Sequence, residues 1–175
     1  MTNSQSSGAP PWLLLNYWIP AVAVAALISV FSTHYFTPEQ TGRVIVPVLR
    51  WFLPHASPNL IRHLHFGIRK IAHVAEFGVF SVFVFRAIRG PRMGWQLNWA
   101  LITLLLATSY ATLDEFHQRY VPLRHSSPKD IAIDALGALL AQIIVWWYAK
   151  KKWPFVWVAG TPIPRRTTYY RIYKD

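Results

Sequence analysis

The chain contains no cysteine and few acidic residues. Without cysteine it can form no disulfide, thiolate nucleophile or zinc–cysteine site. Its 7 Asp and Glu residues stand against 18 Lys and Arg residues. Charged residues make up only 14% of the 175 residues and hydrophobic residues 53%, whereas an ordinary soluble domain is about 25% charged. The composition therefore predicts one membrane-embedded domain.

Four apolar runs are long enough to cross a bilayer core, which needs about 20 helical residues. The first run has no charged side chain over residues 13–33, and Pro20 within it predicts a kink. The second run carries His73 and Glu76, and the fourth carries Asp134. We expect four transmembrane helices, at about residues 13–35, 67–88, 95–113 and 130–149.

A short helix is predicted after the first span, over residues 38–53. Thr37 with Pro38 and Gln40 forms a capping box at its start. Apolar residues at 44, 45, 48, 49 and 52 recur at helical spacing, which is typical of a helix that lies on a bilayer surface. The predicted fold class is all-α: an integral membrane four-helix bundle with a short interfacial helix after the first span.

The distribution of Lys and Arg predicts the orientation. Ten basic residues flank one side of the bundle and eight the other, and residues 150–152 are three lysines directly after an aromatic Trp-Trp-Tyr belt. Both termini are therefore expected to be cytoplasmic, in the inner membrane of a bacterial cell. We divide the chain into a cytoplasmic segment (1–12), the membrane domain (13–152) and a basic aromatic tail (153–175), and we expect the tail to be irregular.

Five of the seven acidic residues are expected to meet at the outer end of this bundle. Glu76 lies about two turns into the second span, Asp114 and Glu115 end the third, and Asp130 and Asp134 begin the fourth. An ionised residue at the bilayer centre costs about 2.5–3.5 kcal/mol on insertion scales. The two deeper carboxylates, Glu76 and Asp134, should therefore face protein, and the sequence predicts one polar pocket.

Helical spacing supports a shared site. Arg69, His73 and Glu76 stand at i, i+4 and i+7, which places them on one helix face. If the third helix continues one turn past its span, residues 114, 117 and 118 also share a face. In the fourth helix, the small residues 137, 138 and 141 predict close contact with a neighbour.

Several of these residues have alternative interpretations. Asp130 stands three residues after Ser127 and would complete a capping box. Arg124 would clamp a phosphate or carboxylate, or would form an ion pair with Asp114 or Glu115. A divalent metal could use the carboxylates with His73, but the sequence has no metal signature, so no cofactor is firmly implied.

Three motifs occur in order along the chain: Arg69-Lys70-x-x-His73-x-x-Glu76-Phe77, Asp114-Glu115-x-x-Gln118-x-x-x-Pro122-x-Arg124 and Asp130-x-x-x-Asp134-x-x-Gly137. Together they resemble the VanZ-like family of membrane proteins over roughly residues 60–145. The chain departs from the family at Asp134, where Asn is usual, and at Phe77, where Tyr is frequent. The resemblance implies a link to teicoplanin resistance, with which the founding member is associated, and no defined reaction.

We expect the polar site to engage an anionic membrane lipid, a lipid-linked cell-wall precursor or a glycopeptide. Nucleic acid is not expected, because the basic residues are divided between two membrane faces. Two alternatives stay open: a non-catalytic structural or partner-binding module, and a small proton-coupled carrier, for which the oligomeric state is not predicted. The candidates for acid–base chemistry are His73, Glu76, Asp114, Glu115 and Asp134. The candidates for binding are Arg69, Lys70, Gln118, Arg124 and Asp130.

Overall fold

A computed structural model describes residues 11–122, 124, 126–152, 155–158 and 161–164. This part of the chain is almost entirely helical, which confirms the all-α prediction for the membrane domain. Its elements, in chain order, are α1 (Pro11–Phe31), the 3-10 turn η1 (His34–Phe36), α2 (Pro38–Phe52), α3 (Pro58–Arg89), α4 (Leu97–Gln118), α5 (Pro128–Lys152), β1 (Phe155–Val158) and β2 (Thr161–Pro164).

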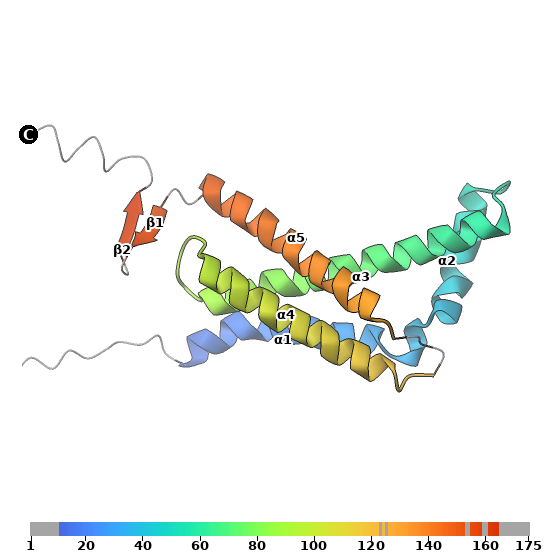
Figure 1. The fold of residues 1–175 in the computed structure, drawn as a ribbon, viewed down its shortest axis with the longest axis horizontal. Coiled ribbons are helices and arrows are strands. Elements are labelled where there is room, and N and C mark those ends of the chain that lie inside the picture. Colours follow the sequence, from blue (N-terminus) through green and yellow to red (C-terminus); the bar gives the residue numbers. More distant parts are fainter. Residues whose placement is uncertain (1–10, 123, 125, 153–154, 159–160, 165–175) are drawn as a thin grey trace, which may run out of the picture.

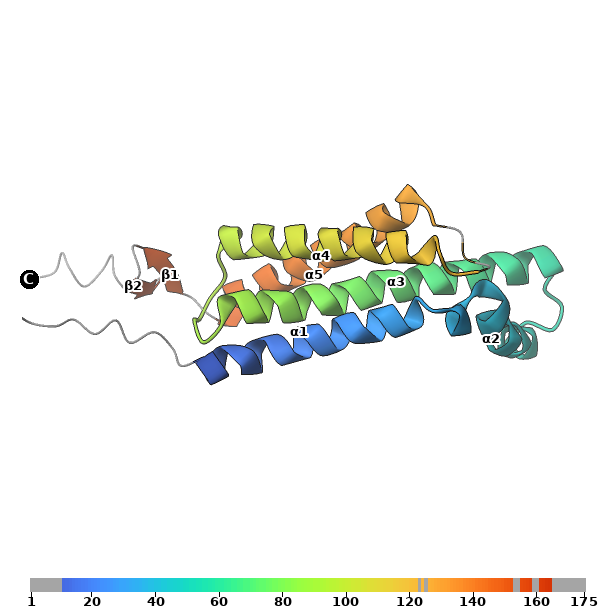
Figure 2. The same cartoon turned by 90° about the horizontal axis from the view of Figure 1, so that it is seen from below.

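Helix α3 is the centre of the bundle, with α1, α4 and α5 packed around it (Figures 1 and 2). By length and hydropathy, the described residues contain two helices able to cross a membrane, α3 and α5. There are up to three if α1 and the η1–α2 segment, which meet at a bend of 70°, are taken as one span. The number of four spans stays a prediction.

Helix α3 is longer than a bilayer core is thick. Its 32 residues extend over about 48 Å at 1.5 Å per residue, against about 30 Å of hydrocarbon. Ser57 caps its start by accepting a hydrogen bond from the Leu60 amide at 3.2 Å. It ends at Gly90, whose φ of 58° is readily adopted only by glycine. The amino-terminal part of α3 extends beyond α4 and α5 and carries α2 (Figure 1).

The short helix after α1 forms as predicted, over residues 38–52 instead of 38–53. Thr37 accepts a hydrogen bond from the Gln40 amide at 3.4 Å, as the capping box requires. The turn η1 was not predicted; it joins α1 to α2. The apolar side chains of Val44 and Trp51 are 68% and 77% exposed, which fits a helix that rests on a lipid surface.

Helices α3 and α5 approach closely at the predicted small-residue stripe. A Cβ atom added to Gly137 would lie 2.3 Å from the carbonyl oxygen of Val74, so no larger residue fits there without movement. Two turns further along α3, Ser81 donates to the Ala138 carbonyl at 3.1 Å, and Gln142 donates to the Ser81 hydroxyl at 2.8 Å. These contacts fix the register of the two helices.

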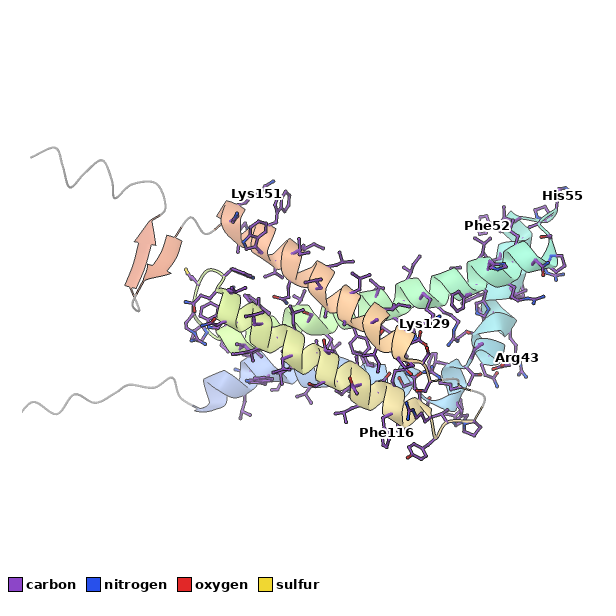
Figure 3. The ribbon with its side chains drawn as sticks, in the orientation of Figure 1. Arg43, Phe52, His55, Phe116, Lys129 and Lys151 are labelled. Atoms are coloured by element: carbon purple, nitrogen blue, oxygen red, sulfur yellow. The ribbon has the colours of Figure 1, made fainter. Side chains whose placement is uncertain are left out.

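Three lysines mark the carboxyl end of α5. Lys150 and Lys151 lie 3.8 and 3.6 Å from the ring centroids of Trp146 and Trp147, so each ammonium group covers an aromatic face. Figure 3 shows Lys151 at the end of α5 opposite to Lys129, and far from Arg43 on α2. The aromatic–lysine belt and α2 therefore stand at opposite ends of the bundle.

The two ends of the described chain differ from the prediction in secondary structure. The prediction of an irregular tail is wrong at residues 155–158 and 161–164, which pair as an antiparallel hairpin in the register Phe155↔Pro164. The prolines had favoured irregular structure, but Phe-Val-Trp-Val is a strong strand former, and proline is tolerated on an edge strand. Helix α1 begins at Pro11, inside the predicted segment 1–12, of which residues 1–10 lie outside the described residues.

Candidate functional site

Two adjoining cavities lie where η1 and α2 approach α3. Arg69, His73 and Arg124 line both of them. The first, here called the apolar cavity, has a volume of about 240 Å³; its other lining residues are Phe31, Ser32, Phe36, Thr41, Ile45, Ile68, Ala72 and Glu76. The second, the basic cavity, has a volume of about 280 Å³; its other lining residues are Pro38, Arg62, His65, Phe66, Lys70, Gln118 and Asp130.

Arg69 connects α3 to the segment between α1 and α2. One guanidinium nitrogen, Nη1, donates to the Phe36 carbonyl at 3.0 Å and to the Thr41 hydroxyl at 3.1 Å. The same hydroxyl donates to the Thr37 carbonyl at 2.9 Å and lies 3.2 Å from Nε2 of His65. Arg69 thus holds η1 and α2 in place with one nitrogen, while the rest of its guanidinium group lines both cavities.

Arg124 closes the site from the loop between α4 and α5. Its Nη2 donates to the carbonyls of Phe31 and Phe36, and its buried Nε has no hydrogen-bond partner among the described residues. Burial lowers the pKa of the Arg124 guanidinium from its ordinary value, and the carboxylates of Asp114 and Glu76 oppose that shift. The alternative of an ion pair between Arg124 and Asp114 or Glu115 is wrong, because the loop turns the guanidinium toward the carbonyls.

Lys70 forms an ion pair with Asp130 at the start of α5. The capping box predicted for Asp130 is therefore wrong. The Ser127 amide, which that box would have satisfied, donates instead to Oε2 of Glu115 at 2.8 Å. A carboxylate from α4 caps the start of α5, and Asp130 is left free to pair with the cation on α3.

His73 lies against Asp134, the most deeply buried acid of the site. Its Nδ1 is 3.4 Å from Oδ1 of Asp134, whose side chain is 1% exposed. Within the described part of the chain, neither oxygen of Asp134 accepts a hydrogen bond. The separation is longer than a formed hydrogen bond of about 2.7–3.2 Å. Among the described residues, His73 is the basic side chain that lies within 4 Å of this carboxylate.

Glu76 lines the apolar cavity together with Arg69 and His73, so the predicted helix face is present. Glu76 makes no hydrogen bond or ion pair with another described residue, although the charges of His73, Asp134, Asp114 and Arg124 act on it. Of the five acids that were expected to share one pocket, Glu76 lines the apolar cavity and Asp130 the basic cavity. Asp114, Glu115 and Asp134 are buried and line neither cavity.

Asp114 and Gln118 belong to the buried face of α4. Gln118 donates to Oδ2 of Asp114 at 2.6 Å and to the Ser32 hydroxyl of α1 at 3.2 Å. Helix α4 does continue past its predicted span end at 113, as this pairing requires. The expectation that His117 shares the face is wrong: it is exposed, because the buried row of α4 runs through residues 111, 114, 115 and 118.

The residues that sequence reasoning missed are Thr41, Ser32 and the carbonyls of Phe31 and Phe36. They reach the site from η1 and its flanks, which no helical spacing relates to α3. No group of three or more His, Asp or Glu side chains that could hold a metal ion occurs in the described residues. A divalent metal at these candidates stays a prediction.

A family model described as VanZ/LLP1 matches residues 17–149. No curated protein matches the chain at a significant level, and no solved structure does so. The matched range includes nearly all of the helical bundle, both cavities and every candidate site residue.

Proposed function

The chain belongs to the VanZ/LLP1 family, and we propose that it binds the anionic head of a membrane lipid, or of a lipid-linked cell-wall precursor, in the cavities between α2 and α3. The membrane character follows from the family and from the apolar helices. The observation that carries the ligand proposal is the contrast between the two cavities, one basic and one apolar, which share Arg69, His73 and Arg124.

The basic cavity has the charge of an anion site. Four of its lining side chains are cationic, namely Arg62, Arg69, Lys70 and Arg124, against one carboxylate, Asp130. Four minus one leaves a formal charge of +3 before His65 and His73 are counted. Arginine is the side chain best suited to phosphate, because its planar donors match the phosphate oxygens.

The apolar cavity provides a place for the hydrocarbon part of such a ligand. Its walls are formed by Phe31, Phe36, Ile45, Ile68 and Ala72. Two of its lining side chains, Phe36 and Ile68, are 36% and 40% exposed, which gives a hydrocarbon chain a way in from the lipid side. An amphiphile with its phosphate at the shared residues would fill both cavities.

The proposed placement in the membrane uses four spans, α1, α3, α4 and α5, with the site at the outer face and both termini in the cytoplasm. The lysines at 150–152 cover an aromatic belt at the far end of α5, as expected at a cytoplasmic interface. The site lies at the other end, next to Lys129 (Figure 3). A lipid-linked wall precursor, and a glycopeptide such as teicoplanin that acts outside the cell, would meet the protein on that face.

A structural module is the second candidate, and one observation favours it. Arg69 and Arg124 both donate to backbone carbonyls that end α1 and form η1. These cations therefore also stabilise the fold, and their loss would disturb η1 whether or not a ligand binds.

The test uses Arg62, which is exposed and makes no hydrogen bond or ion pair with the described residues. Lipids that co-purify with wild type, Arg62→Gln and the control Arg43→Gln are measured by mass spectrometry. Arg43 is exposed on α2 and lines neither cavity, so both variants remove one surface charge. We expect Arg62→Gln alone to lose an anionic lipid. Equal lipid content in all three proteins would contradict the proposal, and teicoplanin susceptibility of cells that carry each variant tests the link to resistance.

A further inference from the structure

We propose that His73 is a nucleophile that removes the terminal phosphoryl group from the diphosphate ester of a single-chain, long apolar alcohol bound at this site. The inference rests on the proposed function and deepens it. It is carried by one juxtaposition: an imidazole backed by a buried carboxylate stands at the boundary between a cavity of net positive charge and an apolar cavity.

The imidazole of His73 is oriented by its surroundings. Its Nδ1 atom is buried and faces Asp134, yet the side chain as a whole is 17% exposed. The exposed part is therefore the opposite edge of the ring, which carries Nε2. Because Asp134 can only accept, the proton belongs on Nδ1 and the lone pair on Nε2. This lone pair is the nucleophile, and it opens toward the two cavities that His73 lines.

The charge of the basic cavity favours a diphosphate over a single phosphate diester. A diphosphate monoester carries about three negative charges at neutral pH, which balances the formal +3 of Arg62, Arg69, Lys70, Arg124 and Asp130. A phosphodiester lipid head carries one negative charge in its phosphate and would leave two cations without a counter-charge.

The size of the apolar cavity favours one chain. At about 240 Å³ it lies below the range of about 300–1,000 Å³ that is usual for whole small-molecule ligands. It accommodates the first carbons of one hydrocarbon chain next to the head, with the rest of the chain in the bilayer.

The reaction has two steps. In the first, the Nε2 lone pair forms a bond to the terminal phosphorus, and the bond between that phosphorus and the bridging oxygen breaks. The lipid monophosphate leaves as a stable anion that needs no proton. In the second, water attacks the phosphorus of the phosphohistidine, the P–N bond breaks with its electron pair returning to Nε2, and the water proton passes to a base. The net change is diphosphate ester plus water to monophosphate ester plus inorganic phosphate.

Two acids serve these steps. Asp134 is a positioning residue, because its charge stabilises the positive charge that develops on the imidazole when Nε2 binds phosphorus. Glu76 is the base, since it lines the apolar cavity with His73 and has no hydrogen-bond or ion-pair partner among the described residues.

The experiment uses the purified full-length protein in detergent micelles with farnesyl diphosphate as the probe. One assay measures phosphate release, and a second measures acid-labile, alkali-stable label on the protein from a probe with 32P in its terminal phosphate. A third measures binding of the non-hydrolysable methylene-bridged analogue. The variants are His73→Ala, His73→Gln and Asp134→Asn, with His63→Ala as the control. His63 is exposed on α3 and lines neither cavity.

We expect wild type and His63→Ala to release phosphate and to carry label, and both His73 variants to lose release and label while still binding the analogue. His73→Gln keeps a donor toward Asp134, so it separates chemistry from folding if His73→Ala is unstable. Asp134→Asn should lower kcat by about 10- to 100-fold with KM unchanged. Analogue binding without phosphate release would overturn the reaction and leave the proposed function standing. Phosphate release that survives in His73→Gln would overturn the nucleophile, and absence of analogue binding in wild type would overturn the ligand class itself.

Discussion

The Nδ1 atom of His73 lies 3.4 Å from Oδ1 of Asp134, across the contact between α3 and α5. This contact exists because Gly137, one turn after Asp134, lets the two helices approach until its Cα hydrogens face the Val74 carbonyl. The small-residue stripe and the polar site therefore depend on the same contact between α3 and α5. Close packing below the site determines how near the carboxylate of α5 comes to the imidazole of α3.

Replacing Gly137 should separate these helices. In Gly137→Ala the new Cβ would meet the Val74 carbonyl oxygen at 2.3 Å, and such overpacking costs about 1–3 kcal/mol. We expect a lower thermal midpoint in detergent. Gly67→Ala is the matched control, because a Cβ there meets nothing within 4 Å and alanine is the better helix former. If both variants unfold at the same temperature, the close approach of α3 and α5 is not as described.

The Lys70–Asp130 pair should show energetic coupling. Each partner is about one-fifth exposed, so solvent screens the pair only partly. We expect Lys70→Met and Asp130→Asn each to destabilise the protein, and the double variant to lose less than the sum of the two. A coupling free energy of about 0.5–3 kcal/mol in a double-mutant cycle would agree with contact. Simple additivity would show that α3 and α5 are not joined here.

Glu115 should protect the backbone amides at the start of α5 from hydrogen exchange. Its Oε2 accepts the Ser127 amide at 2.8 Å, and loss of such a cap costs about 0.5–2 kcal/mol. Glu115→Ala should increase amide hydrogen exchange over residues 127–131. Glu115→Gln keeps a carbonyl acceptor and should change the exchange much less. Equal exchange in the two variants would contradict the capping role.

Glu76→Gln should separate the functional interpretation from the structural one. Glu76 makes no hydrogen bond or ion pair with the described residues, so its amide analogue should be folded and should reach the membrane at wild-type abundance. A functional site predicts that activity or lipid content falls while abundance stays constant. If protein abundance falls in step with activity, the polar cluster serves the fold.

The spacing of residues within one helix was enough to predict part of the site. Arg69, His73 and Glu76 line one cavity as their i, i+4 and i+7 positions predict, because the helix alone fixes which side chains share a face. The stripe at Gly137 was equally predictable, since small residues at this period indicate close helix packing. Both inferences use only local geometry.

Contacts between elements were less predictable. The spacing of Ser127 and Asp130 fits a capping box, but Asp130 pairs with Lys70 from another helix and the Ser127 amide donates to Glu115 instead. Arg124 turns to the carbonyls of Phe31 and Phe36 because the path of its loop brings it to the end of α1. Neither the path nor the turn η1 leaves a periodic signal in the sequence.

Photo-crosslinking would show where on the protein a phosphorylated amphiphile binds. A farnesyl diphosphate analogue with a photoreactive group near its head is irradiated with the purified protein, and labelled peptides are identified by mass spectrometry. We expect label on the walls of the apolar cavity, around Phe36, Ile45 and Ile68, and we expect unlabelled farnesyl diphosphate to compete with it. Label confined to other lipid-facing surfaces, or label that no excess of competitor reduces, would contradict it.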